Sequence, residues 1–477
     1  MSGQMTFART GCACILLVAG LAAAACSAGA PPIQGPAAEV RQLAGARTRV
    51  VWVQHDGSDP RLRGTALTLM GFDSDDGQGE RRILDARGSY VKPMFTADGE
   101  RVIYSTRPEL GPPEIFIVHW DGSGRKKVAD GFAMALWTDP ADEREWLYAG
   151  LDPVSMDTHT VVRFPLDDPS RRETVWTKTK ISMEGFRLSP DGRSASALVP
   201  WPKAAVIELP NGRIRRLGTG CWTSLTFARG PLCWYFDGAH RNVTLVDVDS
   251  DTRWMVNIND APGFDGAEVY HPRWTNHPRI LVLSGPYNQG GRNQARTGGP
   301  QVEIYLGRFS ADFSDIESWA RVTRNAAGDS HPDAWIDLRR STLPQRPSGP
   351  LGPEHVRAAR SGGAGSSADA GRVLVNLQLT RPGPVPDPEA ILPYRHALVV
   401  NEYKVVEVIK GEYKGKTMQV AQWAIRDGKV LPEARRTAGA GATLLVERYD
   451  AHPELEGERL IAGRESRLPL YYDVTAR

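Results

Sequence analysis

His271 and His331 are the side chains of this 477-residue chain best suited to chemistry, because an imidazole can bind a metal ion or transfer a proton near neutral pH. Each stands three or four residues before a tryptophan, and Lys92 has the comparable place before Phe95. A stable metal site needs three or four well-placed ligands, which two histidines and a lysine do not supply. Their shared spacing predicts instead that these residues occupy equivalent positions in a repeated structure.

Two other segments invite a chemical interpretation. A serine nucleophile needs an aspartate and a histidine on a later loop to take its proton, and Gly328-Asp329-Ser330-His331 is better explained as the beginning of a strand. The run Asp73, Asp75 and Asp76 does not place its carboxylates at alternate positions before a glycine, as a calcium loop does. We expect a turn there.

The elements that position these residues repeat along the chain. In Phe95-Thr96-Ala97-Asp98-Gly99 and Leu188-Ser189-Pro190-Asp191-Gly192, a bulky anchor residue leads into a tight polar turn and then into an apolar strand. The six anchors, 39 to 61 residues apart, are Phe95, Trp137, Leu188, Phe227, Trp274 and Trp335. This period matches a four-stranded propeller blade, so the repeat predicts an all-β, six-bladed β-propeller.

A second motif repeats out of phase with the anchors. Asp76-Gly77-Gln78-Gly79 and Asp121-Gly122-Ser123-Gly124 are each followed by a basic residue pair and an apolar pair, and Asn211-Gly212 begins a shorter copy. Asx-Gly turns tolerate positive φ and join antiparallel strands. We expect these turns to lead into the outer strand of each blade.

These motifs resemble the WD40-like repeats of the TolB propeller family. The blade pattern of that family is matched most closely by Lys92-Pro93-Met94-Phe95-Thr96-Ala97-Asp98-Gly99 and by Asp121-Gly122-Ser123-Gly124. The resemblance implies a propeller over residues 48–340 and leaves the activity open, because propellers carry many unrelated functions. Oligogalacturonate lyases use a related propeller with a metal held by several histidines at the channel mouth.

The last anchor predicts how the ring closes. No further strands of its blade follow Trp335, whereas strand-like runs at residues 49–55, 65–72 and 81–85 precede the first anchor. We therefore expect the N-terminal segment to supply three strands of the last blade. Such closure removes exposed sheet edges.

The first 25 residues read as a signal peptide of the lipoprotein type. Arg9 precedes an uncharged stretch that is shorter than a membrane-spanning helix and ends in Ala23-Ala24-Ala25-Cys26, similar to a lipoprotein cleavage box. Cys26 would carry the lipid and residues 26–47 would form a tether. The alternative is ordinary cleavage after an alanine. Either reading predicts export, and lipidation predicts a protein anchored in a bacterial cell envelope, facing the periplasm or the exterior.

Composition limits the partners. The chain has 58 Lys and Arg against 56 Asp and Glu, and this near-neutral balance argues against nucleic acid as a partner.

In an oxidising compartment Cys221 and Cys233 could form a disulfide. Pairing of Phe227 with Leu232 would instead place Cys233 opposite Thr226.

A Pro-, Gly- and Ser-rich linker is expected at residues 341–371, followed by a smaller domain at 372–477. Its alternating apolar and polar runs predict a β-barrel or sandwich, and one hairpin around residues 403–416 resembles OB-like modules. Such a domain could bind a partner of its own or only dock on the propeller.

The function that these features predict is a non-catalytic, membrane-anchored binding or scaffold protein without a cofactor. It would recognise an envelope protein or a cell-wall polymer such as a polysaccharide. The expected contacts are His271, His331 and Lys92 at the channel mouth and the polar loop residues Asn288, Gln289, Arg292 and Asn293. The alternative is a carbohydrate-active enzyme, lyase or hydrolase, working near His271 and His331.

Overall fold

The computed structural model describes residues 35–477 except 57–65, 108–110, 153–156, 229, 288–300, 346–348, 355–370, 463–467 and 476–477. The expected signal peptide, the expected lipid-attachment residue Cys26 and the loop residues Asn288, Gln289, Arg292 and Asn293 lie outside these residues. No helix in the described part of the chain is long and apolar enough to span a membrane.

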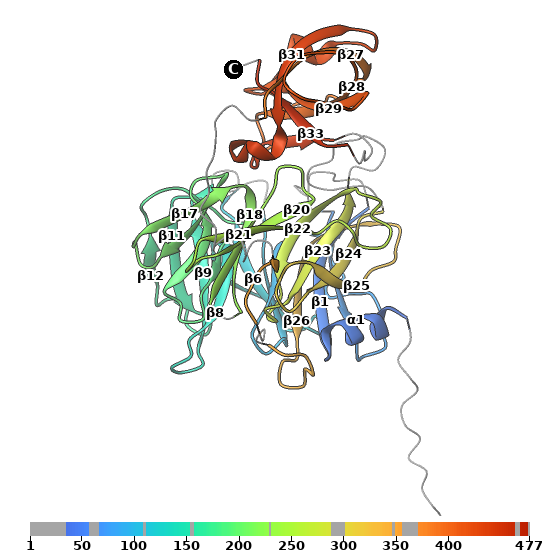
Figure 1. Ribbon diagram of the computed structural model, residues 1–477. Coiled ribbons are helices and arrows are strands. Elements are labelled where there is room, and N and C mark those ends of the chain that lie inside the picture. The colour runs from blue at the N-terminus through green and yellow to red at the C-terminus, as the bar shows by residue number, and fades with distance from the viewer. Residues whose placement is uncertain are drawn as a thin grey trace, which may run out of the picture. The chain divides into compact units, whose positions relative to one another are not determined.

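Six four-stranded antiparallel sheets form the predicted propeller in the described residues (Figure 1). Blade 1 consists of β4 (Val91–Phe95), β5 (Arg101–Ser105), β6 (Glu114–His119) and β7 (Lys126–Asp130). Blade 2 consists of β8 (Phe132–Thr138), β9 (Glu145–Leu151), β11 (Thr160–Pro165) and β12 (Glu173–Trp176), beside a ribbon of β10 (Asp157–Thr158) and β13 (Ile181–Ser182). Blade 3 consists of β14 (Arg187–Leu188), β15 (Ser194–Leu198), β16 (Lys203–Glu208) and β17 (Ile214–Thr219).

The other three blades complete the ring. Blade 4 consists of β18 (Cys221–Phe227), β19 (Pro231–Phe236), β20 (Asn242–Asp247) and β21 (Thr252–Asn257). Blade 5 consists of β22 (Glu268–Trp274), β23 (Ile280–Tyr287), β24 (Glu303–Phe309) and β25 (Ile316–Arg321). Blade 6 consists of β26 (Gly328–Ile336), β1 (Thr48–His55), β2 (Thr68–Asp73) and β3 (Arg81–Arg82).

The turn glycines of the repeat leave space for the anchor side chains of neighbouring blades. The Trp335 ring lies so close to Gly99 that a Cβ there would approach it to 2.4 Å, and Trp137 approaches Gly192 in the same way. Both indoles also donate hydrogen bonds to carbonyl groups of these turns, Trp335 to Ala97 and Trp137 to Pro190, each at 2.9 Å. The repeated motif therefore joins one blade to the next as well as shaping each blade.

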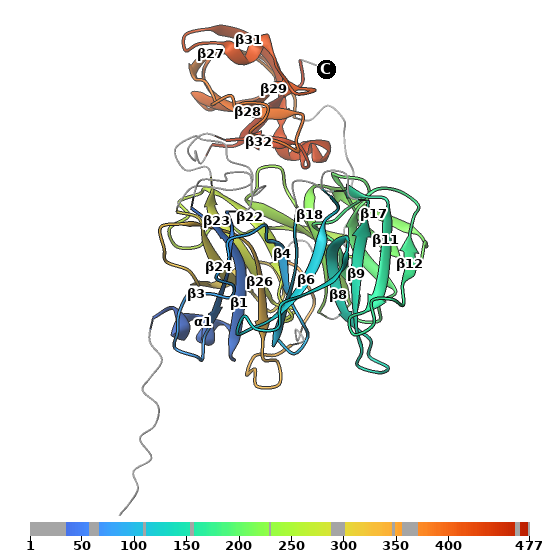
Figure 2. The ribbon, with the colours of Figure 1, turned by 180° about the vertical axis from the view of Figure 1, so that it is seen from behind.

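The ring closes as the sequence predicts, because the N-terminal strand β1 pairs with β26 and is followed outward by β2 and β3. β1 and β26 lie side by side in the two opposite views of Figure 1 and Figure 2. Across the pair, the Trp52 indole and the Gln54 amide donate to Asp329 Oδ1 at 2.8 and 3.0 Å. The first and last parts of the propeller are thus held by polar contacts as well as by the ladder.

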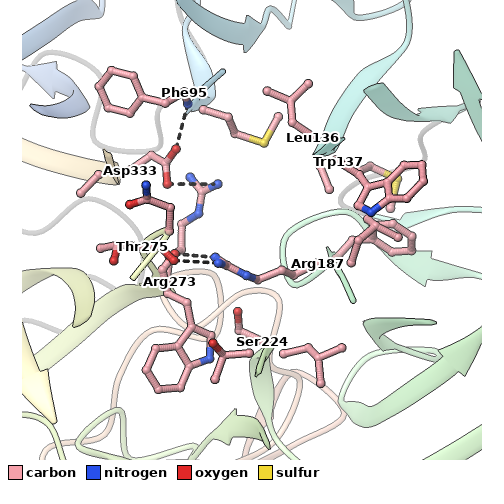
Figure 3. A pocket seen from close by; sticks show the side chains of 18 of the residues that line it. Phe95, Leu136, Trp137, Arg187, Ser224, Arg273, Thr275 and Asp333 are labelled. Carbon is pink, nitrogen blue, oxygen red and sulfur yellow. Dashed lines mark hydrogen bonds and ion pairs between the residues drawn. The ribbon is translucent and has the colours of Figure 1, made fainter. Parts of the chain in front are cut away.

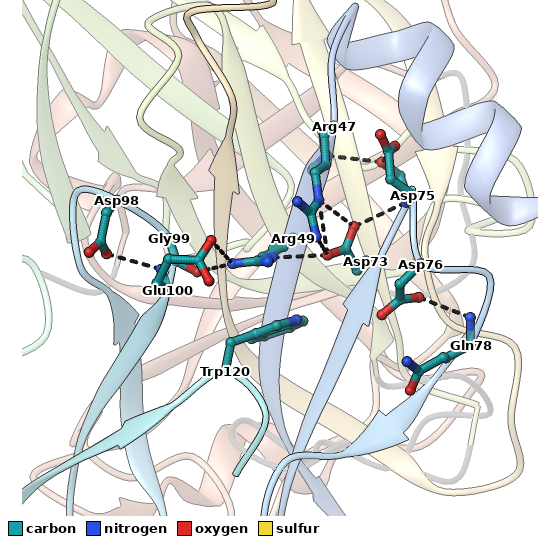
Figure 4. A network of polar contacts seen from close by, with 12 residues as sticks. Arg47, Arg49, Asp73, Asp75, Asp76, Gln78, Asp98, Gly99, Glu100 and Trp120 are labelled. Atoms are coloured by element: carbon teal, nitrogen blue, oxygen red, sulfur yellow. Dashed lines mark hydrogen bonds and ion pairs between the residues drawn. The ribbon is translucent and has the colours of Figure 1, made fainter. Parts of the chain in front are cut away.

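The aspartate run at 73–76 binds arginines in a turn. Asp73 accepts hydrogen bonds from Arg47 and Arg49, with the shortest at 2.6 and 2.9 Å (Figure 4). Asp75 pairs with Arg41 at 2.5 Å. Burial would raise the pKa of Asp73, but the two guanidinium groups outweigh burial and lower it. This network confirms the expected turn and ties β1 to the end of β2.

The expected tether is wrong for its second half. Residues 36–44 form helix α1 (Pro36–Ala44), whose Val40, Leu43 and Ala44 are buried against β-strands of blades 5 and 6. Pro36 in the first helical turn and Gly45 in the left-handed C-cap conformation suit a short helix.

The C-terminal domain is a closed barrel rather than a sandwich. Around it, in order, run β27 (Val373–Arg381), β28 (Ala397–Lys410), β29 (Thr417–Arg426), β33 (Leu470–Asp473) and β31 (Gly441–Arg448). β29 pairs parallel with β33, and the remaining pairs are antiparallel. This arrangement is the OB-like barrel that the hairpin suggested. The short elements are β30 (Lys429–Val430), β32 (Arg459–Ile461) and the 3-10 turns η2 (Pro432–Arg435), η3 (Tyr449–Ala451) and η4 (Pro453–Leu455).

Contacts between the barrel and blades 4 and 5 are buried and polar. The fully buried Arg459 pairs with Glu268 at 2.6 Å, and Tyr394 hydrogen-bonds with His240 at 2.8 Å. Burial would raise the pKa of Glu268, but Arg459 and His240 lower it to about 2. Ile391 and Ile461 join the apolar cluster of these blades.

Candidate ligand-binding site

The three residues predicted at the channel mouth share one backbone geometry. Lys92, His271 and His331 each adopt a positive φ, of 49°, 55° and 51°, and Trp222 of blade 4 does so at 47°. Each lies in the innermost strand of its blade, where the pairing register shifts as at a β-bulge. The equivalent spacing in the sequence therefore corresponds to an equivalent bulge.

These bulges bring the two histidines together. The rings of His271 and His331 lie 3.9 Å apart between centroids, and Trp222 lies edge-on to His271 at 5.0 Å. His271 is only 2% exposed and accepts or donates a hydrogen bond with Ser284 at 2.8 Å. The described residues contain no group of three His, Cys, Asp or Glu side chains placed to hold a metal ion. The histidines form a packed layer rather than an open mouth.

An open cavity lies toward the other ends of the inner strands, where the anchors stand. Its volume is about 710 Å³, and residues of all six blades line it (Figure 3). Lys92 and Trp222 belong to its lining, whereas His271 and His331 do not. Its apolar lining includes Met94, Met134, Leu136, Phe186, Leu225 and Leu338.

Two arginines cross this cavity between blades. Arg187 of blade 3 donates to the carbonyl oxygens of Trp274 and Thr275 in blade 5, at 2.5 and 2.7 Å. Arg273 of blade 5 donates to the carbonyl oxygen of Pro93 in blade 1 at 3.0 Å. Figure 3 shows both guanidinium groups reaching into the space between the inner strands.

Arg273 has a carboxylate beside it and Arg187 does not. Asp333 Oδ1 lies 3.8 Å from Arg273, and Asp333 Oδ2 accepts the Phe95 N–H at 2.9 Å. Among the described residues, the structure records no carboxylate within ion-pair distance of Arg187. Burial lowers the pKa of Arg187 to about 10, although the more distant charge of Asp333 acts to raise it.

Lys92 is held at the inner end of the cavity by carbonyl groups. Its Nζ donates to the carbonyl oxygens of Met134 and Met183 at 2.7 and 2.5 Å, and the side chain is buried. Burial and then the nearby Arg273 lower the pKa of Lys92 well below its ordinary value. The Lys92 amine is thus already occupied by blades 2 and 3.

Cys221 and Cys233, which the sequence left open as a disulfide pair, are both free and buried. Cys221 pairs with Phe236 and Cys233 with Leu225 in the β18–β19 ladder, so the two cysteines are not opposite each other. The hairpin pairs Phe227 with Pro231, one residue from the expected register. Burial raises the pKa of both thiols to about 12.

Arg187, Arg273 and Asp333 were not identified from the sequence. Each stands one or two residues before an anchor, on the inner strand of its blade. Side chains alternate along a strand, so Arg187 and Arg273, which directly precede their anchors, are expected on the opposite face from the anchor. Asp333 stands two residues before Trp335, and alternation does not distinguish it from the anchor.

No family model matches the sequence, and no curated protein matches it. Solved structures similar to the chain include TolB from Acinetobacter baumannii, with a TM-score of 0.42, 15% identity and coverage of 63% of this chain and 68% of that one. The observed fold is the six-bladed propeller that the motifs predict. A TolB structure from Agrobacterium tumefaciens has a TM-score of 0.39 and 12% identity, and covers 59% of this chain and 91% of that one.

Enzymes also occur among the similar structures. Kuenenia stuttgartiensis hydrazine synthase has a TM-score of 0.39 and 12% identity, over 65% of this chain and 49% of that one, so the chain spans about half of that protein. At such identities the likeness concerns the fold alone.

Proposed function

We propose that this protein is a non-catalytic binding protein of the bacterial cell envelope, and that the cavity at the anchor ends of the inner strands is its ligand site. The observation that carries the proposal is a cavity of about 710 Å³ to which every blade contributes. Ligand sites are concave and mostly apolar with a few polar groups that fix orientation. The rigid ring supplies that arrangement here.

The partner we propose is an envelope protein, and the lipid at Cys26 would hold the propeller at a membrane surface. The support for an exported, anchored chain is the leader and cleavage-box pattern at residues 1–26. The near-neutral charge agrees with a protein partner rather than a nucleic acid.

Site-specific photocrosslinking tests the proposal. A photoreactive amino acid replaces Pro140, an exposed residue of the cavity lining, and the matched control replaces Met255, which is 62% exposed on the outer strand of blade 4. We expect a discrete crosslinked partner in intact cells from position 140 and none from position 255. Equal products from both positions, or none from position 140, would contradict a binding site in the cavity.

A further inference from the structure

The charged side chains that line the cavity differ in their recorded partners. Arg273 has Asp333 beside it, and the Lys92 amine donates to two carbonyl groups. Glu184 also lines the cavity, and its charge acts on Lys92. Arg187 is left with carbonyl oxygens as its recorded partners.

Arg187 keeps unused donor capacity. A guanidinium has five N–H groups, and the recorded bonds of Arg187 go to two carbonyl oxygens. Those bonds also hold the side chain in position across the channel, so little conformational entropy remains to be lost on binding. A planar fork of this kind matches the geometry of a carboxylate.

The surroundings of Arg187 select the molecule that carries the carboxylate. The cavity lining combines apolar side chains such as Leu188 and Leu225 with hydroxyl and amide side chains such as Ser224 and Asn276. A peptide can place aliphatic side chains on the apolar part of this lining and hydrogen-bond through its backbone to the polar part. An acidic residue flanked by apolar residues fits both the charge and the lining.

Resting on the proposed function of the cavity, we propose that its ligand is a peptide segment of the partner protein that presents a carboxylate to Arg187. The carboxylate forms an ion pair with the guanidinium, and the flanking apolar side chains occupy the surface formed by Leu188, Leu225 and their neighbours. Arg187 is then the residue that determines specificity for acidic over neutral segments.

The test begins with a displayed library of random peptides selected on the full chain. Selected peptides that compete with one another at the cavity are expected to share an acidic residue among apolar ones. Changing that residue from Asp to Asn or from Glu to Gln is expected to weaken binding to the unaltered protein by tenfold or more, the usual effect of losing a charge-assisted hydrogen bond. This comparison uses the unmodified protein and does not depend on any variant folding.

Protein variants then place the effect at one residue. Arg187→Gln is expected to bind acidic and neutral peptides equally, and Arg187→Lys to keep part of the preference. The matched control is Arg213→Gln, because the Arg213 side chain is 86% exposed and pairs with Glu208, and neither residue lines the cavity. An unchanged preference for acidic peptides in Arg187→Gln would overturn the inference.

The outcomes separate this inference from the proposed function. Peptides that bind the cavity without acidic preference overturn the role of Arg187 and leave the cavity as a binding site. A tetramer of galacturonic acid that binds through Arg187, with no peptide selected, overturns the peptide in favour of an acidic polysaccharide. Absence of any crosslinked partner from position 140 contradicts the proposed function itself.

Discussion

The stability lost when a glycine of the repeated turns is replaced depends on what the neighbouring blade places against it. Gly99 has a φ of +72° and lies under the Trp335 ring, where an added Cβ would meet the ring at 2.4 Å. Gly99→Ala should therefore lower the free energy of unfolding for two reasons. The left-handed backbone conformation costs about 1 kcal/mol, and overpacking against the indole costs about 1–3 kcal/mol. Denaturant unfolding followed by tryptophan fluorescence measures the change.

Gly77 is the matched control, since its φ of +69° is nearly the same and nothing lies within 4 Å of an added Cβ. Gly77→Ala is expected to show the backbone cost alone. If the two variants lose equal stability, the indole contact does not explain why the repeat contains glycine at this position.

The closure between β1 and β26 should depend on pH through one carboxyl group. Asp329 is buried in the strand pair, and burial raises its pKa from 3.8 to about 7 although Gln54 and Asn325 hydrogen-bond to it. The folded protein therefore holds this proton more tightly than the unfolded chain. Its stabilising contribution is complete below pH 3.8 and is lost as the pH rises through 7, by roughly 4 kcal/mol at most.

Thermal melts of the protein and of Asp329→Asn at several values of pH between 4 and 8 check this prediction. Other groups titrate in the same range, so the quantity to compare is the slope of melting temperature against pH. We expect a shallower decline in Asp329→Asn, because the amide does not ionise. Parallel slopes would show that Asp329 does not titrate in this range.

At the scale of the whole molecule, removing one partner of the buried Arg459–Glu268 ion pair should weaken the association of the propeller with the barrel. Arg459→Met leaves the Glu268 carboxylate buried next to His240 without its guanidinium. Removing one member of such a pair typically costs 3–5 kcal/mol. Calorimetry should show a lower first transition and a barrel that unfolds separately from the propeller.

Two controls accompany this variant. Arg213→Ala removes a surface ion pair and should change stability little. Combining Arg459→Met with Glu268→Gln removes the uncompensated charge, so the double variant is expected to recover part of the loss. A double variant less stable than Arg459→Met alone would argue that packing, not charge, is what Arg459 supplies.

The sequence by itself determined the propeller, its closure and the presence of a second β domain. The anchors and Asp-Gly turns are local signals that can be recognised in the sequence. Six repeats of such signals predict six similar sheets that bury their apolar faces against one another. The strand-like runs before Phe95 and their lack after Trp335 were enough to place β1 beside β26. The closed, OB-like order of the barrel needed the tertiary structure, because pairing β29 with β33 joins strands far apart in the chain.

Only the tertiary structure decided where the candidate site lies. Spacing aligned His271 with His331, but the burial of His271 and the 3.9 Å contact between the two rings show that the histidines pack against each other. The carbonyl oxygens that Arg187 contacts belong to Trp274 and Thr275 of blade 5, almost ninety residues away along the chain. The partners of each charged group in the cavity come from several blades. A local sequence pattern therefore cannot predict them.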